Sequence, residues 1–163
     1  MAEFLTQGAA INDLLRVCFR LNRSLVDAAQ LLTEGTPVTG AQWGVLTSFS
    51  LNSDPDTVAE VARRMNLARQ SVQRVADVLE QAGLVEYLPN PADKRAKLVR
   101  VTQAGSELLA ELEVRQQAWL RDVVGGMPEA DIEAAAHLIE AIATEIGAGT
   151  GITHAPDAMR IAS

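Results

Sequence analysis

The sequence predicts a mainly α-helical fold with one small β-hairpin, and two observations support this prediction. Apolar residues recur every three or four positions along most of the chain, which is the spacing of helices that pack by one face. Between Leu84 and Thr102 this spacing gives way to two short β-prone runs separated by prolines. With 163 residues, 48% of them hydrophobic, the chain is long enough for one domain with its own core.

The first long helix is predicted in residues 1–37, where an apolar stripe runs from Ile11 to Leu32. Gly35 and Pro37 follow this stripe, and both residue types are typical of a helix end. The stripe consists of Ile11, Leu14, Leu15, Cys18, Leu25, Ala29 and Leu32.

Two short helices are predicted next, joined by a tight turn. The first starts near Thr57, because Thr57 and Glu60 have the spacing of a capping box. Asn66 tolerates left-handed backbone angles and so offers the turn. The second helix begins close to Ala68 and stops at Gly83. This pattern is typical of a helix-turn-helix.

The second of these helices has an apolar face and a polar face. Its inward positions are Val72, Val75, Ala76 and Leu79. Its outward positions are Arg69, Gln70, Gln73 and Arg74, in the half of the helix that meets base edges when such a helix enters the major groove. Arginine can pair bidentately with guanine and glutamine with adenine, each contributing about 1–3 kcal/mol of discrimination. The alternative is an ordinary solvated face.

The two β-prone runs, Leu84 to Leu88 and Lys97 to Thr102, are predicted to pair as a hairpin, here called the wing. Its tip holds two prolines and presents Lys94 and Arg95, and Lys97 lies just beyond. An arginine on a thin loop can enter the minor groove while lysines neutralise phosphates. DNA would repel a carboxylate, so we expect Asp93 to hydrogen-bond within the loop and to orient Arg95 by charge-assisted pairing.

The charge distribution favours the same surface. The chain carries a net charge of −7, yet from Thr57 to Thr102 eight Lys and Arg stand against five Asp and Glu, so this segment carries +3 and the remainder −10. An acidic remainder should repel DNA everywhere except at the basic face.

Several segments, in order, resemble the MarR family of transcriptional regulators. Residues 38–46 are similar to the opening of the family's second helix, residues 71–85 to its recognition helix, residues 90–96 to its wing, and residues 101–105 to the exit from the wing. The resemblance implies a winged helix-turn-helix core over residues 38–102 that binds double-stranded DNA and usually represses transcription. It also implies that Ser71 belongs to the DNA-binding residues. Tyr87 departs from the pattern, because a basic residue is frequent there.

Two further helices are predicted over residues 103–147. Gly125-Gly126 ends the first, and Pro128 opens the second at the favoured first helical position. Their apolar faces exceed what the winged core can bury, so we expect the terminal helices to form a homodimer around a twofold axis. The alternative is an intrachain bundle. Residues 148–163 are predicted to be a mobile tail.

The sequence does not identify the effector. The resemblance implies a small-molecule pocket where the dimerisation helices meet the winged core, which Phe19, Trp43, Phe49 and Trp119 could line. These aromatic residues equally fit plain core packing.

A second possibility is redox sensing through Cys18, because Arg16, Arg20 and Arg23 lie close on the same helix and could favour its thiolate. Cys18 equally fits the apolar stripe of that helix.

The inventory of reactive residues argues against an enzyme. The two histidines stand alone, and no phosphate loop, metal-ligand spacing or nucleophilic triad is present, so no cofactor or metal is predicted. The sequence contains no predicted membrane span, and we expect a cytoplasmic protein. A winged protein-interaction module without DNA binding is the remaining alternative, although such a module has no need of basic residues on both helix and wing.

Overall fold

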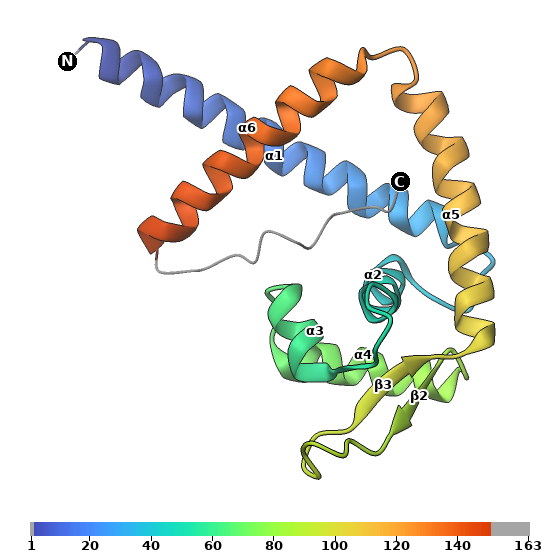
Figure 1. Cartoon of the computed structure of the whole chain (residues 1–163). Coiled ribbons are helices and arrows are strands. Elements are labelled where there is room, and N and C mark those ends of the chain that lie inside the picture. Colours follow the sequence, from blue (N-terminus) through green and yellow to red (C-terminus); the bar gives the residue numbers. More distant parts are fainter. Residues whose placement is uncertain (1, 151–163) are drawn as a thin grey trace. The chain divides into compact units, whose positions relative to one another are not determined.

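The computed structural model describes residues 2–150, and their side chains over residues 8–149 (Figure 1). The chain divides after Ala41 into two compact units. Most of the tail predicted at residues 148–163 lies outside the described residues, and the last helix continues through Thr150, so residues 148–150 are helical.

The first unit is dominated by helix α1, Ala2–Leu32, which starts well before the apolar stripe identified in the sequence. The helix ends where predicted. Thr33 Oγ1 donates a hydrogen bond to the Ala29 carbonyl at 2.9 Å, and Gly35 has a φ of 76°, a left-handed angle that glycine adopts without a steric penalty.

The second unit begins with α2, Gly40–Ser50, followed by α3, Val58–Arg64, and α4, Arg69–Gln81. The capping box is present: Glu60 N–H donates to Thr57 Oγ1 at 3.3 Å, and Thr57 N–H donates to Glu60 Oε2 at 2.7 Å. Asn66 has a φ of 51° in the turn between α3 and α4. The predicted helix-turn-helix is therefore present.

The second unit also contains a three-stranded antiparallel sheet. It consists of β1, Asp56–Thr57, β2, Val85–Leu88, and β3, Leu98–Val101, in the order β1-β3-β2. In the wing, Val85 pairs with Val101 and Leu88 with Leu98. The sequence predicted β2 and β3 but not β1, whose two residues pair with Val99 and Leu98.

After the wing come α5, Gln103–Val124, and α6, Glu129–Thr150. Gly105 allows the start of α5 to pass close to the base of the wing, because a Cβ at this position would lie 2.1 Å from the Leu84 carbonyl oxygen. Pro128 immediately precedes α6, one residue before the predicted position, and its carbonyl accepts hydrogen bonds from Asp131 and Ile132.

The core of the second unit lies between α2, α3, α4, the first half of α5 and the sheet (Figure 1). Apart from Phe49, it is built from aliphatic side chains that the helical and strand periodicities turn inward. Its largest fully buried side chains are Leu46, Val61, Val72, Leu79, Val85, Val99 and Leu112.

Candidate nucleic-acid interface

The outward face of α4 carries the side chains predicted to contact bases. Arg69, Gln70 and Arg74 are exposed, whereas Ser71 and Gln73 are half-buried. Arg69, Gln70, Gln73 and Arg74 line one open hollow on the surface. Val72 and Ala76, on the opposite side of the helix, are buried in the core. The core therefore fixes which face of α4 is left for a partner.

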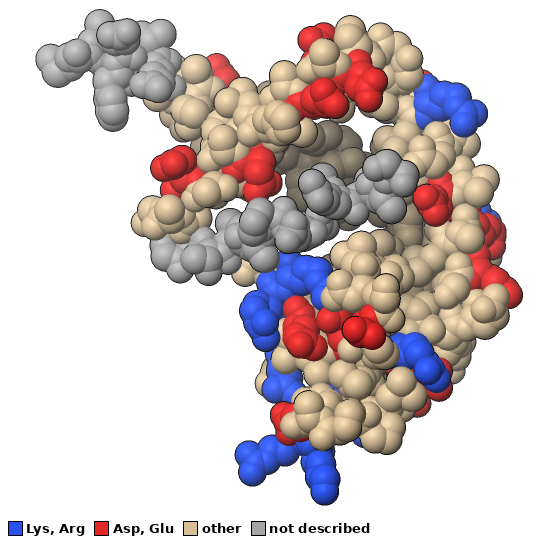
Figure 2. Space-filling model, in the orientation of Figure 1, with Lys and Arg blue, Asp and Glu red and all other residues tan. Residues whose placement is uncertain are grey.

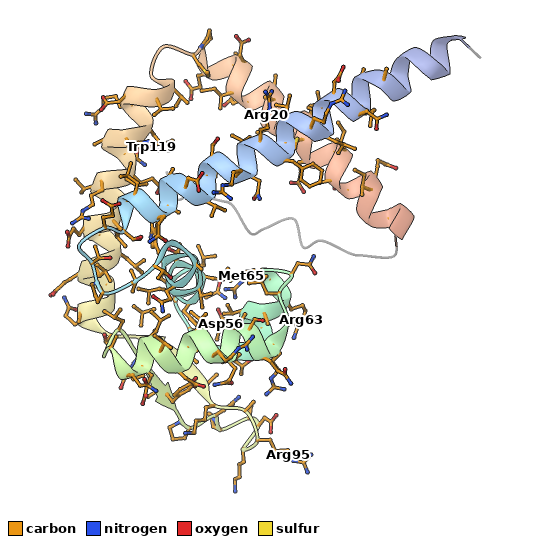
Figure 3. The ribbon with its side chains drawn as sticks, turned by 180° about the vertical axis from the view of Figure 1, so that it is seen from behind. Arg20, Asp56, Arg63, Met65, Arg95 and Trp119 are labelled. Carbon is orange, nitrogen blue, oxygen red and sulfur yellow. The ribbon has the colours of Figure 1, made fainter. Side chains whose placement is uncertain are left out.

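The tip of the wing presents Lys94 and Arg95 to solvent, and Figure 3 shows Arg95 projecting away from the helices. Two short side chains order the loop: Asn90 Oδ1 accepts a hydrogen bond from the Ala92 N–H at 2.9 Å, and Asp93 Oδ1 accepts one from the Arg95 N–H at 2.9 Å. Asp93 thus hydrogen-bonds within the loop as expected. Its partner, however, is the Arg95 backbone and not the expected guanidinium.

The physical reason is reach. The Asp93 carboxylate accepts a hydrogen bond from the backbone N–H two residues later, which closes a short local ring. Pairing with the guanidinium would instead fold the long Arg95 side chain back over the loop. The Arg95 guanidinium consequently extends from the tip.

The wing and α4 are joined by a triangle of hydrogen bonds. Gln73 Nε2 donates to Asp77 Oδ1 at 2.8 Å and to the Tyr87 hydroxyl at 2.7 Å, and the Tyr87 hydroxyl donates to Asp77 Oδ1 at 2.7 Å. Burial and the Asp77 carboxylate raise the pKa of Tyr87 above that of an ordinary tyrosine, which is itself protonated at neutral pH. This contact could not be predicted from the sequence, because Tyr87 lies 14 residues beyond Gln73, on a strand.

Tyr87 also positions a cation. The Lys97 ammonium nitrogen lies 5.3 Å from the centroid of the Tyr87 ring, within the range of a cation–π interaction. Although the chain has no basic residue at position 87, this contact places a positive charge beside it. Lys97 is exposed, so the charge is open to a phosphate.

A buried ion pair holds strand β1, which pairs with β3 of the wing, to the helices. Arg64 Nη2 lies 2.6 Å from Asp56 Oδ2, and Arg64 Nη1 donates to the Ser48 carbonyl at 2.6 Å. Asn52 Nδ2 donates to both oxygens of Asp56 at 3.1 Å. No role for these residues follows from the sequence alone. A buried Asp in a two-residue strand leaves no periodic signal, so only the pairing of β1 with β3 could have shown it.

Figure 2 shows the charge asymmetry on one face, with Lys and Arg at the tip of the wing and Asp and Glu along α6. Helix α6 contains five Asp and Glu and no Lys or Arg. The basic side chains of α4 and the wing therefore lie in one unit with an acidic helix that DNA would avoid.

The four aromatic residues proposed for an effector pocket have different surroundings. Phe49 is buried in the core, Trp43 and Trp119 are half-buried, and Phe19 on α1 is 75% exposed. The burial of Phe49 is explained by core packing.

Cys18 is half-buried on α1, and two of the arginines near it in sequence already have carboxylate partners. Arg16 pairs with Asp13, and Arg23 pairs with Asp27 at 3.0 Å. Their charges are thus compensated on the helix itself.

The described part of the chain lacks two other features. Among residues 2–150, no helix has the length and apolar character needed to cross a bilayer. Within the same residues, His, Cys, Asp and Glu side chains form no group of three placed to bind a metal ion.

A helix-turn-helix with an exposed polar face, followed by a basic wing, defines a winged helix-turn-helix DNA-binding protein. The sequence model of the MarR family matches residues 36–96. The chain is 32% identical over 109 residues to the HTH-type transcriptional regulator ML2140 of Mycobacterium leprae, covering 67% of this chain and 73% of the relative. The protein belongs to the MarR family of transcriptional regulators and is not an enzyme.

Solved structures share the fold. A mutant of MarR from E. coli complexed with operator DNA has a TM-score of 0.73 and 23% identity, covering 81% of this chain and 94% of that chain. CouR from Rhodococcus jostii RHA1, bound to p-coumaroyl-CoA, has a TM-score of 0.72 and 23% identity, covering 80% of this chain and 92% of that chain.

Proposed function

We propose that this regulator binds a pseudo-palindromic operator as a homodimer, represses transcription there, and releases the DNA when a small molecule binds. The observation that carries the proposal is the exposure, within one compact unit, of the polar face of α4 and the basic tip of the wing. Arg69, Gln70, Ser71, Gln73 and Arg74 would contact bases, and Lys94, Arg95 and Lys97 would contact the minor groove and phosphates.

Exposed apolar side chains support the homodimer. Leu138 on α6 is 56% exposed and Val114 on α5 is 71% exposed, and α1 carries further exposed aliphatic residues. Long helices with apolar faces in water are typical of subunit interfaces. A twofold dimer would place two copies of α4 about 34 Å apart, one turn of duplex, which explains why the operator should be an inverted repeat.

Two structural relatives support the remaining parts of the proposal. The MarR mutant was solved with operator DNA, and CouR was solved with p-coumaroyl-CoA. By analogy, a ligand of this protein would favour a dimer geometry whose α4 helices no longer match the groove spacing, within the limit of its differential affinity for the two states. An operator on chromosomal DNA would place the protein in the cytoplasm.

The test is the selection of bound duplexes from a random DNA pool by the purified protein at about 150 mM salt. The wild type should enrich an inverted repeat. Arg95→Ala should weaken binding to all duplexes and flatten the salt dependence by about 0.9 units in log–log slope, the contribution of one phosphate contact. The matched control is Arg121→Ala, which removes the same charge from an exposed position on α5.

Two results would contradict the proposal. If the wild type enriches no sequence, the protein-interaction alternative is favoured instead. If light scattering at micromolar concentration gives the 17.4 kDa mass of one chain and not twice that mass, the dimer is excluded.

A further inference from the structure

Gln73, on the face of α4 that we propose meets the bases, is held on one edge by two other side chains. Its Nε2 donates to Asp77 Oδ1 at 2.8 Å and to the Tyr87 hydroxyl at 2.7 Å. The Tyr87 hydroxyl in turn donates to Asp77 Oδ1 at 2.7 Å, which closes the triangle. Asp77 comes from the next turn of α4 and Tyr87 from β2, so the amide is anchored from two elements.

The chemistry of the partners determines which edge of the amide they hold. A carboxylate only accepts hydrogen bonds, so only the nitrogen edge of Gln73 can face Asp77. The Gln73 carbonyl oxygen therefore points the other way. Among the described residues no buried side-chain nitrogen or oxygen lacks a hydrogen-bond partner, and Oε1 accepts no hydrogen bond, so this oxygen is reached by solvent on a residue that lines the surface hollow.

We propose that Asp77 and Tyr87 are positioning residues that make Gln73 present only its carbonyl oxygen to the DNA, so that it reads the exocyclic amino group of adenine or cytosine. This inference rests on the proposed function, because it assumes that α4 enters the major groove. It replaces the bidentate adenine contact that the sequence suggested.

The bases differ in what a lone acceptor can use. Adenine N6 and cytosine N4 donate into the major groove, whereas guanine and thymine present only acceptors at the corresponding edge. An unrestrained glutamine also donates to adenine N7, which separates adenine from cytosine. With Nε2 committed to Asp77 and Tyr87, that distinction is lost, and adenine and cytosine become nearly equivalent.

Two properties of Tyr87 keep the restraint in place. Its hydroxyl is protonated at neutral pH, as in any tyrosine, and burial raises its pKa further, so the hydroxyl keeps donating to Asp77 in alkaline solution as well. The Lys97 ammonium over its ring adds a contact on the face of the aromatic side chain.

The experiment measures binding of the purified protein to operators that carry each of the four bases at the position read by Gln73. That position is identified as the one where Gln73→Ala abolishes base preference. The test variants are Tyr87→Phe, which removes only the hydroxyl, and Asp77→Asn, which lets either edge of the Gln73 amide face it. Gln81→Ala, at an exposed position on the same helix, is the control.

The wild type and Gln81→Ala should bind the adenine and cytosine operators within about twofold and the other two about tenfold more weakly. Tyr87→Phe and Asp77→Asn should each shift the preference toward adenine over cytosine by about fivefold, because the freed N–H reaches N7. In a Gln73→Ala background, neither change should alter the ratio.

An unaltered adenine-to-cytosine ratio in both variants overturns this inference alone, as does a shift that persists without Gln73. Failure of the wild type to select any site overturns the proposed function and this inference together. Because the readout is a ratio between operators for the same protein, a general loss of stability does not imitate it.

Discussion

Replacing Arg64 by Met tests whether the buried ion pair fastens β1, and through it the wing, to the helices. The Arg64 and Asp56 side chains are 16% and 10% exposed, and their closest nitrogen–oxygen distance is 2.6 Å. Methionine retains much of the aliphatic stem but removes the guanidinium contacts to Asp56 and to the carbonyl and hydroxyl oxygens of Ser48. The variant leaves the Asp56 carboxylate buried with Asn52 as its side-chain donor.

The expected loss follows from that burial. Removing one partner of a buried ion pair costs about 3–5 kcal/mol, since the remaining charge is left uncompensated in a medium of low polarity. The two hydrogen bonds from Asn52 place this case near the lower end, about 3 kcal/mol. The exposed pair between Arg100 and Glu86, with side chains 56% and 45% exposed, should contribute less than about 1 kcal/mol.

The assay is urea unfolding at one fixed protein concentration, because dimerisation would make the stability depend on concentration. With an m-value of about 2 kcal/mol per molar urea, Arg64→Met should lower the midpoint by about 1.5 M. The matched variant Arg100→Met should lower it by less than about 0.5 M. Adding Asp56→Asn to Arg64→Met should restore part of the loss, because the buried charge is then absent. Equal midpoints for Arg64→Met and Arg100→Met would refute the reasoning.

Three further predictions concern local features of the fold. Thr57→Ala should lower the free energy of unfolding by about 1 kcal/mol in urea, because α3 loses its N-cap; an unchanged midpoint would contradict this. The hydrogen bonds from the backbone and side chain of Thr57 lower the pKa of Glu60. Their contribution to the stability of the fold is therefore present above the pKa of an unfolded Glu, and it is lost as pH falls through the lowered value. The Tm difference between wild type and Thr57→Ala should accordingly narrow in acid. Gly105→Ala should cost about 1–3 kcal/mol, because its Cβ would meet the Leu84 carbonyl, whereas Gly126→Ala, with open space around it, should be nearly neutral by thermal melting.

What the sequence predicted correctly was set by interactions between near neighbours. The capping box at Thr57, the left-handed turn at Asn66 and the stop at Gly83 each depend on residues within one helical turn, and all three are present. The faces of α4 followed from its periodicity, since Val72 and Ala76 are buried and the arginines are exposed.

What the sequence did not predict depends on contacts between distant residues. Strand β1 exists because Asp56 pairs with Val99, more than forty residues later, and two residues carry no periodic pattern. Tyr87 was identified only as a departure from a family pattern. Its role became visible when β2 packed beside α4 and brought the hydroxyl to Gln73 and Asp77.

These two unpredicted networks act on the same strand from opposite sides. Strand β3 is the centre of the sheet, and β1 on one side is tied to α3 by Arg64 and Asp56. On its other side, β2 is tied to α4 by Tyr87. These contacts fix the position of the wing relative to α4, so the two elements should move together as one rigid body. Under the proposed function, an effector would then release DNA by changing the spacing between two such bodies, and not by separating a wing from its own recognition helix.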